Sequence, residues 1–124
     1  KTSLLRAFAK ALGGYADIVA VQAGWRDRQD LLGYYNAFDK KYHESSFVKA
    51  LYAAQCPTWS DRLFIVVLDE MNLSYIEQFG ADLLSELESP KKPNLPQLGL
   101  MDSRPPRRPT RLLEEGAAIA VPPN

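Results

Sequence analysis

The stretch LFIVVLDE, residues 63–70, decides the fold. Its first six residues are all apolar and include two valines and an isoleucine, which favours a short strand covered on both faces. Strands of that kind occur in parallel sheets, whose connecting helices pack on either side. The stretch therefore predicts an α/β fold with a parallel sheet, and it places Asp69 and Glu70 at the carboxyl end of the strand.

Helical patterns lie on both sides of this strand. Residues 2–12 place Leu4, Leu5, Phe8 and Leu12 on one helical stripe, and two glycines follow as a stop, because glycine adopts the left-handed conformation without steric cost. The short β-branched run DIVAVQ favours a second strand. The expected elements are a helix over 2–12, a strand over 17–22, a helix capped by Ser45 or Ser46 and ended by Cys56-Pro57, a strand over 63–70 and a helix over 75–88.

Residues 24–42 show no sustained hydrophobic period. We expect a loop there with one helical turn over 28–32. Its aromatic residues are expected to pack the loop against the core, although aromatics interleaved with cations also suit base stacking in a nucleic-acid site. These aromatics are Trp25, Tyr34, Tyr35 and Phe38.

The overall composition excludes several classes of protein. The chain has 124 residues, with 15 basic and 15 acidic side chains and 46% hydrophobic residues, which fits one small globular domain. No apolar run reaches the roughly 18 residues that span a bilayer. A single cysteine, Cys56, and a single histidine, His43, exclude an internal disulfide framework and a multi-cysteine zinc site. We expect a soluble, cytoplasmic protein, with His43 solvated and Cys56 a passive thiol.

Basic residues and prolines gather late in the chain. Residues 1–89 hold nine basic and twelve acidic side chains, whereas residues 90–111 hold six basic and one acidic, and eight of the nine prolines follow residue 89. We expect a compact core over 1–88, an exposed basic proline-rich loop over 89–110, and a β-hairpin within 111–124. The loop is either a solvated segment or a contact for a nucleic-acid backbone or an acidic neighbouring subunit. The cations of the loop and of the residue that follows it are Lys91, Lys92, Arg104, Arg107, Arg108 and Arg111.

Two short pairs of residues suggest chemistry. A helix that opens with Lys1-Thr2 matches the end of a phosphate-binding loop, where the lysine adds a cation and the hydroxyl binds magnesium; alone, the pair equally suits a solvated helix start. Asp69 at the end of a buried strand can hold a magnesium shell, and Glu70 can orient or deprotonate an attacking water. The plainer interpretation is that Asp69-Glu70 only ends a strand and caps a turn.

Taken together, these elements resemble a P-loop NTPase core of the AAA+ type. The stretch LFIVVLDEMNLSYIEQFGADLLSELE (63–88) is similar to the Walker B strand and following helix of the McrB-like group, the nucleotide-hydrolysing subunits of methylcytosine-dependent restriction systems. VQAGWRDRQDLLGYYN (21–36) also resembles that group, and AIAVPPN (118–124) resembles the approach to its sensor 1 strand. The resemblance implies a P-loop NTPase parallel-sheet core ending in a β-hairpin.

The resemblance also implies roles for five residues. Lys1 would contact phosphate, Thr2 and Asp69 would hold Mg²⁺, Glu70 would be the catalytic acid, and Asn72 would help to position the nucleotide site. The cofactors would be magnesium with ATP or GTP. The partners would be further copies of the chain in a ring, together with DNA or a partner nuclease, in restriction or defence.

Departures from the family pattern qualify this expectation. The phosphate-loop glycines would precede Lys1, sensor 1 would follow Asn124, and the helical lid is not in the sequence. We therefore expect a central fragment of a longer AAA+ core, and we expect the isolated chain not to hydrolyse nucleotide. The alternative is an interaction or regulatory module that keeps the AAA+ fold without hydrolysis, against which the presence of Glu70 argues.

Overall fold

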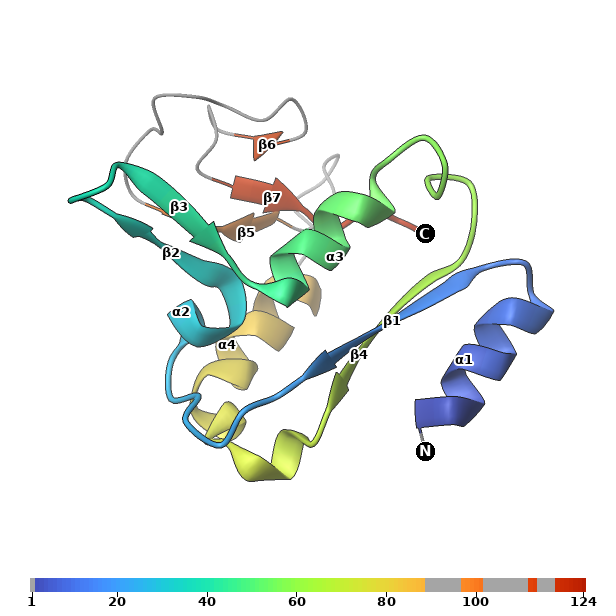
Figure 1. Cartoon of the computed structure of the whole chain (residues 1–124), viewed down its shortest axis with the longest axis horizontal. Coiled ribbons are helices and arrows are strands. Elements are labelled where there is room, and N and C mark those ends of the chain that lie inside the picture. The colour runs from blue at the N-terminus through green and yellow to red at the C-terminus, as the bar shows by residue number, and fades with distance from the viewer. Residues whose placement is uncertain (1, 89–96, 102–111, 114–117) are drawn as a thin grey trace.

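The computed structural model describes residues 2–88, 97–101, 112–113 and 118–124. These residues form an α/β arrangement with one parallel strand pair and additional antiparallel pairs (Figure 1). None of the described helices combines the length and the apolar character needed to cross a membrane. The elements are α1 (Thr2–Ala11), β1 (Tyr15–Ala20), α2 (Arg28–Leu32), β2 (Gly33–Asn36), β3 (Lys41–Glu44), α3 (Ser46–Ala54), β4 (Phe64–Asp69), the 3₁₀ helix η1 (Met71–Leu73), α4 (Ile76–Glu88), β5 (Gln97–Gly99), β6 (Leu112–Leu113) and β7 (Ala118–Ala120).

The parallel pair consists of β1 and β4. Their register runs from Tyr15 opposite Phe64 to Ala20 opposite Asp69, and backbone hydrogen bonds of 2.9 Å from Tyr15 to Leu63 and from Val21 to Asp69 extend it at both ends. The parallel arrangement predicted from residues 63–70 is confirmed. The first strand begins two residues earlier than predicted, because the chain enters it directly from the turn that ends α1.

Helices α1 and α3 lie on either side of this strand pair (Figure 1). The predicted first helix is present, but its apolar stripe is not buried: Leu4 is 69% exposed and Leu12 is 59% exposed, and Ala9 is the buried residue of α1. The expectation that residues 63–68 are covered on both faces is also wrong, since in β4 only Phe64 is fully buried and the rest are half-buried. On the α1 side, Ala9 is the one buried residue of the helix, so α1 covers the strand pair only thinly.

The main core lies on the other face, where α2, α3 and α4 meet the sheet. Ser45 caps α3 as predicted, accepting a hydrogen bond from the Val48 amide at 3.2 Å. Apolar side chains from β1, α2, α3, α4, β5 and β7 form one buried cluster, and a smaller cluster of Ala50, Ala54 and Phe64 adjoins it. The larger cluster contains Val19, Val21, Leu31, Leu32, Phe47, Val48, Leu51, Leu83, Leu98 and Ile119.

The segment predicted as a loop over 24–42 is mostly ordered secondary structure. The helical turn over 28–32 is confirmed as α2, but β2 and β3 follow it as an antiparallel hairpin, with Tyr34 opposite His43 and Tyr35 opposite Tyr42. Aromatic residues on facing strands stabilise each other across the ladder. With four residues each, the two strands are too short to show a hydrophobic period in the sequence.

The carboxyl-terminal strands form a separate antiparallel sheet in the order β5-β7-β6. The predicted hairpin within 111–124 is confirmed by the pairing of β6 with β7. The loop predicted over 89–110 is wrong at residues 97–99, which form β5 and place Leu98 in the core. Five basic residues of that predicted loop, and Arg111 directly after it, lie outside the described residues: Lys91, Lys92, Arg104, Arg107, Arg108 and Arg111.

Asn124 fixes the start of β4. Its carbonyl oxygen accepts a hydrogen bond from the Phe64 amide at 3.0 Å. Its side-chain amide donates to the carbonyl oxygens of Ala54, Trp59 and Arg62 at 2.7–3.1 Å. The strand that ends in the acidic pair is thus held at its beginning by a residue from the far end of the described chain.

Candidate functional site

The candidate site lies where the first turn of α1 meets the carboxyl end of β4. The Thr2 hydroxyl oxygen, Oγ1, donates a hydrogen bond to Asp69 Oδ2 at 3.0 Å, across 67 positions of sequence. Both residues are half-buried. The carboxyl end of a parallel strand and the amino end of a helix are the places where α/β proteins hold anionic ligands. The structure therefore brings together two of the residues predicted to share a magnesium site.

Asp69 is held by three neighbouring groups. Its Oδ1 lies 3.2 Å from the backbone amide of Glu70, its Oδ2 accepts from Thr2, and its carbonyl oxygen accepts from the Val21 amide at 2.9 Å. The carboxylate also lies beside the first turn of a ten-residue helix, where the helix dipole favours negative charge. These contacts fix the position of the Asp69 carboxylate beside the start of α1.

Glu70 leaves the strand in an unusual conformation. Its φ is 60° and its ψ is 36°, which is the left-handed helical region. A residue other than glycine in this region costs of order 1 kcal/mol or more and persists only where its surroundings impose it. The Glu70 carbonyl accepts from the Leu73 amide at 3.0 Å, which starts the turn η1. Glu70 thus directly follows Asp69 at the edge of the sheet, and it is exposed.

Asn72 and Lys1 are the other two residues predicted to belong to the site. Asn72 lies in η1, two residues after Glu70, and is exposed. Lys1 lies outside the described residues. The structure thus places Thr2, Asp69 and Glu70 within one small region, which we call the Thr2–Asp69–Glu70 site, with Asn72 nearby.

The donor atoms of this site suit a hard divalent cation. A hydroxyl and a carboxylate are oxygen ligands of the kind that Mg²⁺ prefers. Within the described ranges, no group of three or more His, Cys, Asp or Glu side chains could hold a metal ion. Mg²⁺ usually keeps several waters and is held by one or two carboxylates with substrate phosphates, and a hydroxyl with one carboxylate can serve that kind of coordination.

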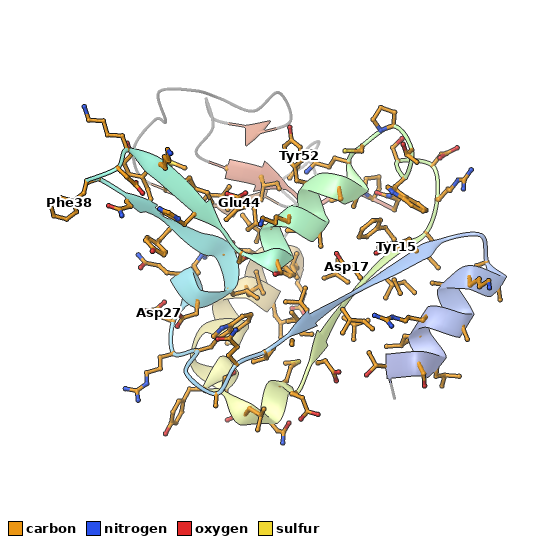
Figure 2. All side chains as sticks on the ribbon, in the orientation of Figure 1. Tyr15, Asp17, Asp27, Phe38, Glu44 and Tyr52 are labelled. Atoms are coloured by element: carbon orange, nitrogen blue, oxygen red, sulfur yellow. The ribbon has the colours of Figure 1, made fainter. Side chains whose placement is uncertain are left out.

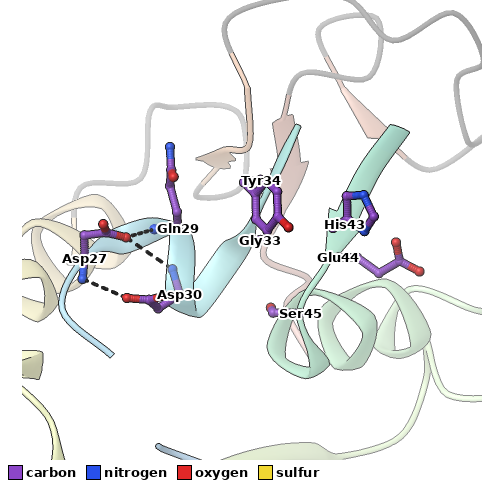
Figure 3. A pocket seen from close by; sticks show the side chains of 8 residues that line it. All are labelled: Asp27, Gln29, Asp30, Gly33, Tyr34, His43, Glu44 and Ser45. Atoms are coloured by element: carbon purple, nitrogen blue, oxygen red, sulfur yellow. Dashed lines mark hydrogen bonds between the residues drawn. The ribbon is translucent and has the colours of Figure 1, made fainter. Parts of the chain in front are cut away.

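A separate pocket of about 490 Å³ lies between α2 and the β2–β3 hairpin (Figure 3). Asp27 and Asp30 line it, but their carboxylates already form the capping box of α2: Asp27 Oδ1 accepts from the Asp30 amide at 3.3 Å, and Asp30 Oδ2 accepts from the Asp27 amide at 3.2 Å. The acids of this pocket therefore have a structural role at the start of the helix. The spacing of Asp27 and Asp30 is a helix-start signal that can be recognised in the sequence.

The two residues predicted to be chemically passive show ordinary surroundings. His43 is exposed, as expected, stacks on Tyr34 and lies 2.9 Å from Asp39 Oδ2 through Nε2. Cys56 is a free thiol whose Sγ lies 3.7 Å from the Tyr52 carbonyl oxygen.

Comparisons with known proteins identify no relative. No protein-family model, no curated protein and no solved structure matches the chain. The function is therefore inferred from the residues and geometry of the Thr2–Asp69–Glu70 site.

Proposed function

We propose that this chain forms part of the nucleotide-binding core of a magnesium-dependent nucleoside triphosphatase of the AAA+ type, related to the McrB-like group. The observation that carries the proposal is the 3.0 Å hydrogen bond between Thr2 Oγ1 and Asp69 Oδ2. It joins the start of a helix to the end of a parallel strand, and each residue matches a magnesium-shell position of P-loop NTPases. The substrate would be ATP or GTP.

The residues divide the chemistry between them. Thr2 and Asp69 would hold the magnesium ion, which supplies positive charge to the phosphates when bound. Glu70 would accept a proton from the water that attacks the terminal phosphate, because its carboxylate is exposed beside Asp69. By the same resemblance, Lys1 would contact the phosphates and Asn72 would help to position the site. Hydrolysis would be coupled, in a homo-oligomeric ring, to the movement of DNA or to a partner nuclease.

The test is the substitution Glu70→Gln in the intact protein that contains this chain. Removal of a general base lowers turnover by about 100-fold or more, whereas the neutral amide keeps the size of the side chain. We expect turnover to be lost and nucleotide affinity to be retained, measured by phosphate release and by titration with a fluorescent nucleotide. Glu77→Gln is the matched control, because Glu77 is also an exposed acid and lies in the first turn of α4.

Two outcomes separate the alternatives. Undiminished turnover in Glu70→Gln would refute the role of Glu70. An unsubstituted protein that binds nucleotide without hydrolysing it would identify an interaction or regulatory module that keeps the fold.

A further inference from the structure

The tip of the β2–β3 hairpin is an ordered structure that holds an aromatic side chain fully in solvent. Phe38 is 100% exposed, and Figure 2 shows it at the outer end of the hairpin, directed away from the rest of the molecule. The Phe38 amide donates to Asn36 Oδ1 at 2.9 Å and the Lys41 amide donates to Asp39 Oδ1 at 3.0 Å. The expectation that Phe38 packs against the core is therefore wrong, and its exposure belongs to a defined turn.

One acid and two exposed lysines carry the charge at this tip. Asp39, the acid of the turn, accepts the Lys41 amide and lies 2.9 Å from His43 Nε2, and the hydrogen bond with His43 lowers the pKa of its carboxyl. Lys40 and Lys41 are exposed. Within the described part of the chain, neither lysine forms an ion pair. The turn therefore presents one exposed aromatic ring beside two exposed lysines, and the charge of Asp39 acts on Lys41 from the same turn.

A second aromatic surface lies on one face of the same hairpin. Tyr34 stacks on His43, with ring centroids 5.2 Å apart, and Tyr34 is 48% exposed. Side chains two residues apart on a strand point to the same face. His43 and Lys41 are two apart on β3, so the Tyr34–His43 pair shares a face of the hairpin with Lys41. At about 3.4 Å per residue, this stacked pair lies roughly 10 Å from the tip.

We propose that the tip of the β2–β3 hairpin binds single-stranded nucleic acid, with a base stacked on Phe38 and the phosphate backbone beside Lys40 and Lys41. A flat ring flanked by cations is the pattern by which proteins bind single strands without reading sequence. A protein partner would require a larger apolar patch than one ring beside Ala37. Three acids, Asp27, Asp30 and Glu44, line the pocket at the base of the hairpin. Their negative charge repels phosphates, so the nucleic acid would contact only the outer half of the hairpin.

The experiment measures binding of a fluorescein-labelled oligothymidylate of about 20 nucleotides, longer than the site covered by one small domain, to the intact protein without nucleoside triphosphate. Fluorescence anisotropy gives the affinity at several salt concentrations. Phe38→Ala should weaken binding about 5-fold to 150-fold, the range for loss of one base–aromatic stack, and Phe38→Trp should restore it. Replacing Lys40 and Lys41 together by alanine should reduce the slope of log affinity against log salt by about 1.4.

The controls place a matched change elsewhere on the surface. Phe8→Ala removes a phenylalanine that is 53% exposed on α1, and Lys10→Ala removes an exposed lysine of the same helix; both should bind as the unsubstituted protein does. The proposal is wrong if the unsubstituted protein does not bind the oligonucleotide, if a duplex of equal length binds as tightly, or if Phe38→Ala binds unchanged. Because no nucleotide hydrolysis is measured, its failure would leave the proposed function intact, and failure of Glu70→Gln would leave this proposal intact.

Discussion

Gly33 is the residue that joins α2 to the β2–β3 hairpin, and its replacement by alanine should destabilise the protein strongly. Its φ is 91° and its ψ is −177°, a region that is almost exclusive to glycine and costs other residues about 1–3 kcal/mol. A Cβ added at Gly33 would lie 2.1 Å from the carbonyl oxygen of His43 and 3.1 Å from Glu44 Cα. The two strands would have to separate by more than about 1 Å to reach ordinary contact distance, which breaks the first pair of the hairpin.

The strain and the lost hydrogen bonds together give the expected loss of stability. Strain of about 1–3 kcal/mol and the loss of one or two hydrogen bonds at about 1 kcal/mol each predict a loss of about 2–5 kcal/mol in the free energy of unfolding. That is a large part of the 5–15 kcal/mol typical of a whole domain. At roughly 4 °C per kcal/mol for a domain of this size, the melting temperature should fall by about 8–20 °C.

The assay is thermal and urea unfolding followed by circular dichroism, with Gly24→Ala as the matched control. A Cβ at Gly24 would meet nothing within 4 Å, and Gly24 has no left-handed conformation to lose. The control should be neutral or more stable by a few tenths of a kcal/mol, since alanine restricts the unfolded chain. A Gly33→Ala protein that unfolds within about 1 kcal/mol of the unsubstituted one would refute the close approach between Gly33 and His43.

Two further predictions concern the contacts around the same hairpin. Burial, with a smaller contribution from the charge of Glu44, raises the pKa of Tyr42 to about 12 from its ordinary 10.0. The folded state therefore keeps the phenol proton while the unfolded chain loses it, and stability present below pH 10 should be lost between pH 10 and 12. Tyr42→Phe should flatten this decline in urea midpoints and cost about 1 kcal/mol at neutral pH, because the hydroxyl donates to the Leu32 carbonyl; an unchanged alkaline slope would contradict the assignment. Arg28 forms a bidentate ion pair with Glu86 at 2.6 and 2.9 Å, with both side chains 36% exposed. Arg28→Lys should lower the free energy of unfolding by no more than about 1 kcal/mol. A double-mutant cycle with Glu86→Gln should show a coupling energy between the two side chains. A coupling energy of zero would contradict a stabilising role for this ion pair.

The sequence predicted those parts of the fold whose signals are local. The run over 63–68 identifies a strand by its own residues, and Asp69 and Glu70 follow it directly, so the end of the strand and its acids were located together. The parallel pairing with β1 follows because a helix separates the two strands along the chain. The proximity of Thr2 to Asp69 follows from the same topology, because the start of α1 and the end of β4 meet at one edge of the parallel strand pair.

The hairpin was missed because its evidence lies in pairs of residues that are distant in sequence. Its strands have four residues each, too few for an alternating pattern to stand out. What identifies them is Tyr34 against His43 and the close contact of Gly33 with the His43 carbonyl, and neither is visible until the strands are aligned. The exposed stripe of α1 is a similar case, since periodicity locates an apolar face but does not state what covers it.

The Thr2–Asp69–Glu70 site and the hairpin are supported by different contacts, so substitutions can separate them. β4 is held at its start by the Asn124 carbonyl and at its end by the Val21 amide, and the carboxylate of Asp69 is held by Thr2 and by the amide of Glu70. None of these groups belongs to β2, β3 or the turn between them. The hairpin connects to the remainder of the fold through α2 and α3, the elements on either side of it in the chain. Strain at Gly33 therefore acts first on the hairpin, and the geometry at Asp69 depends on it only through the shared core.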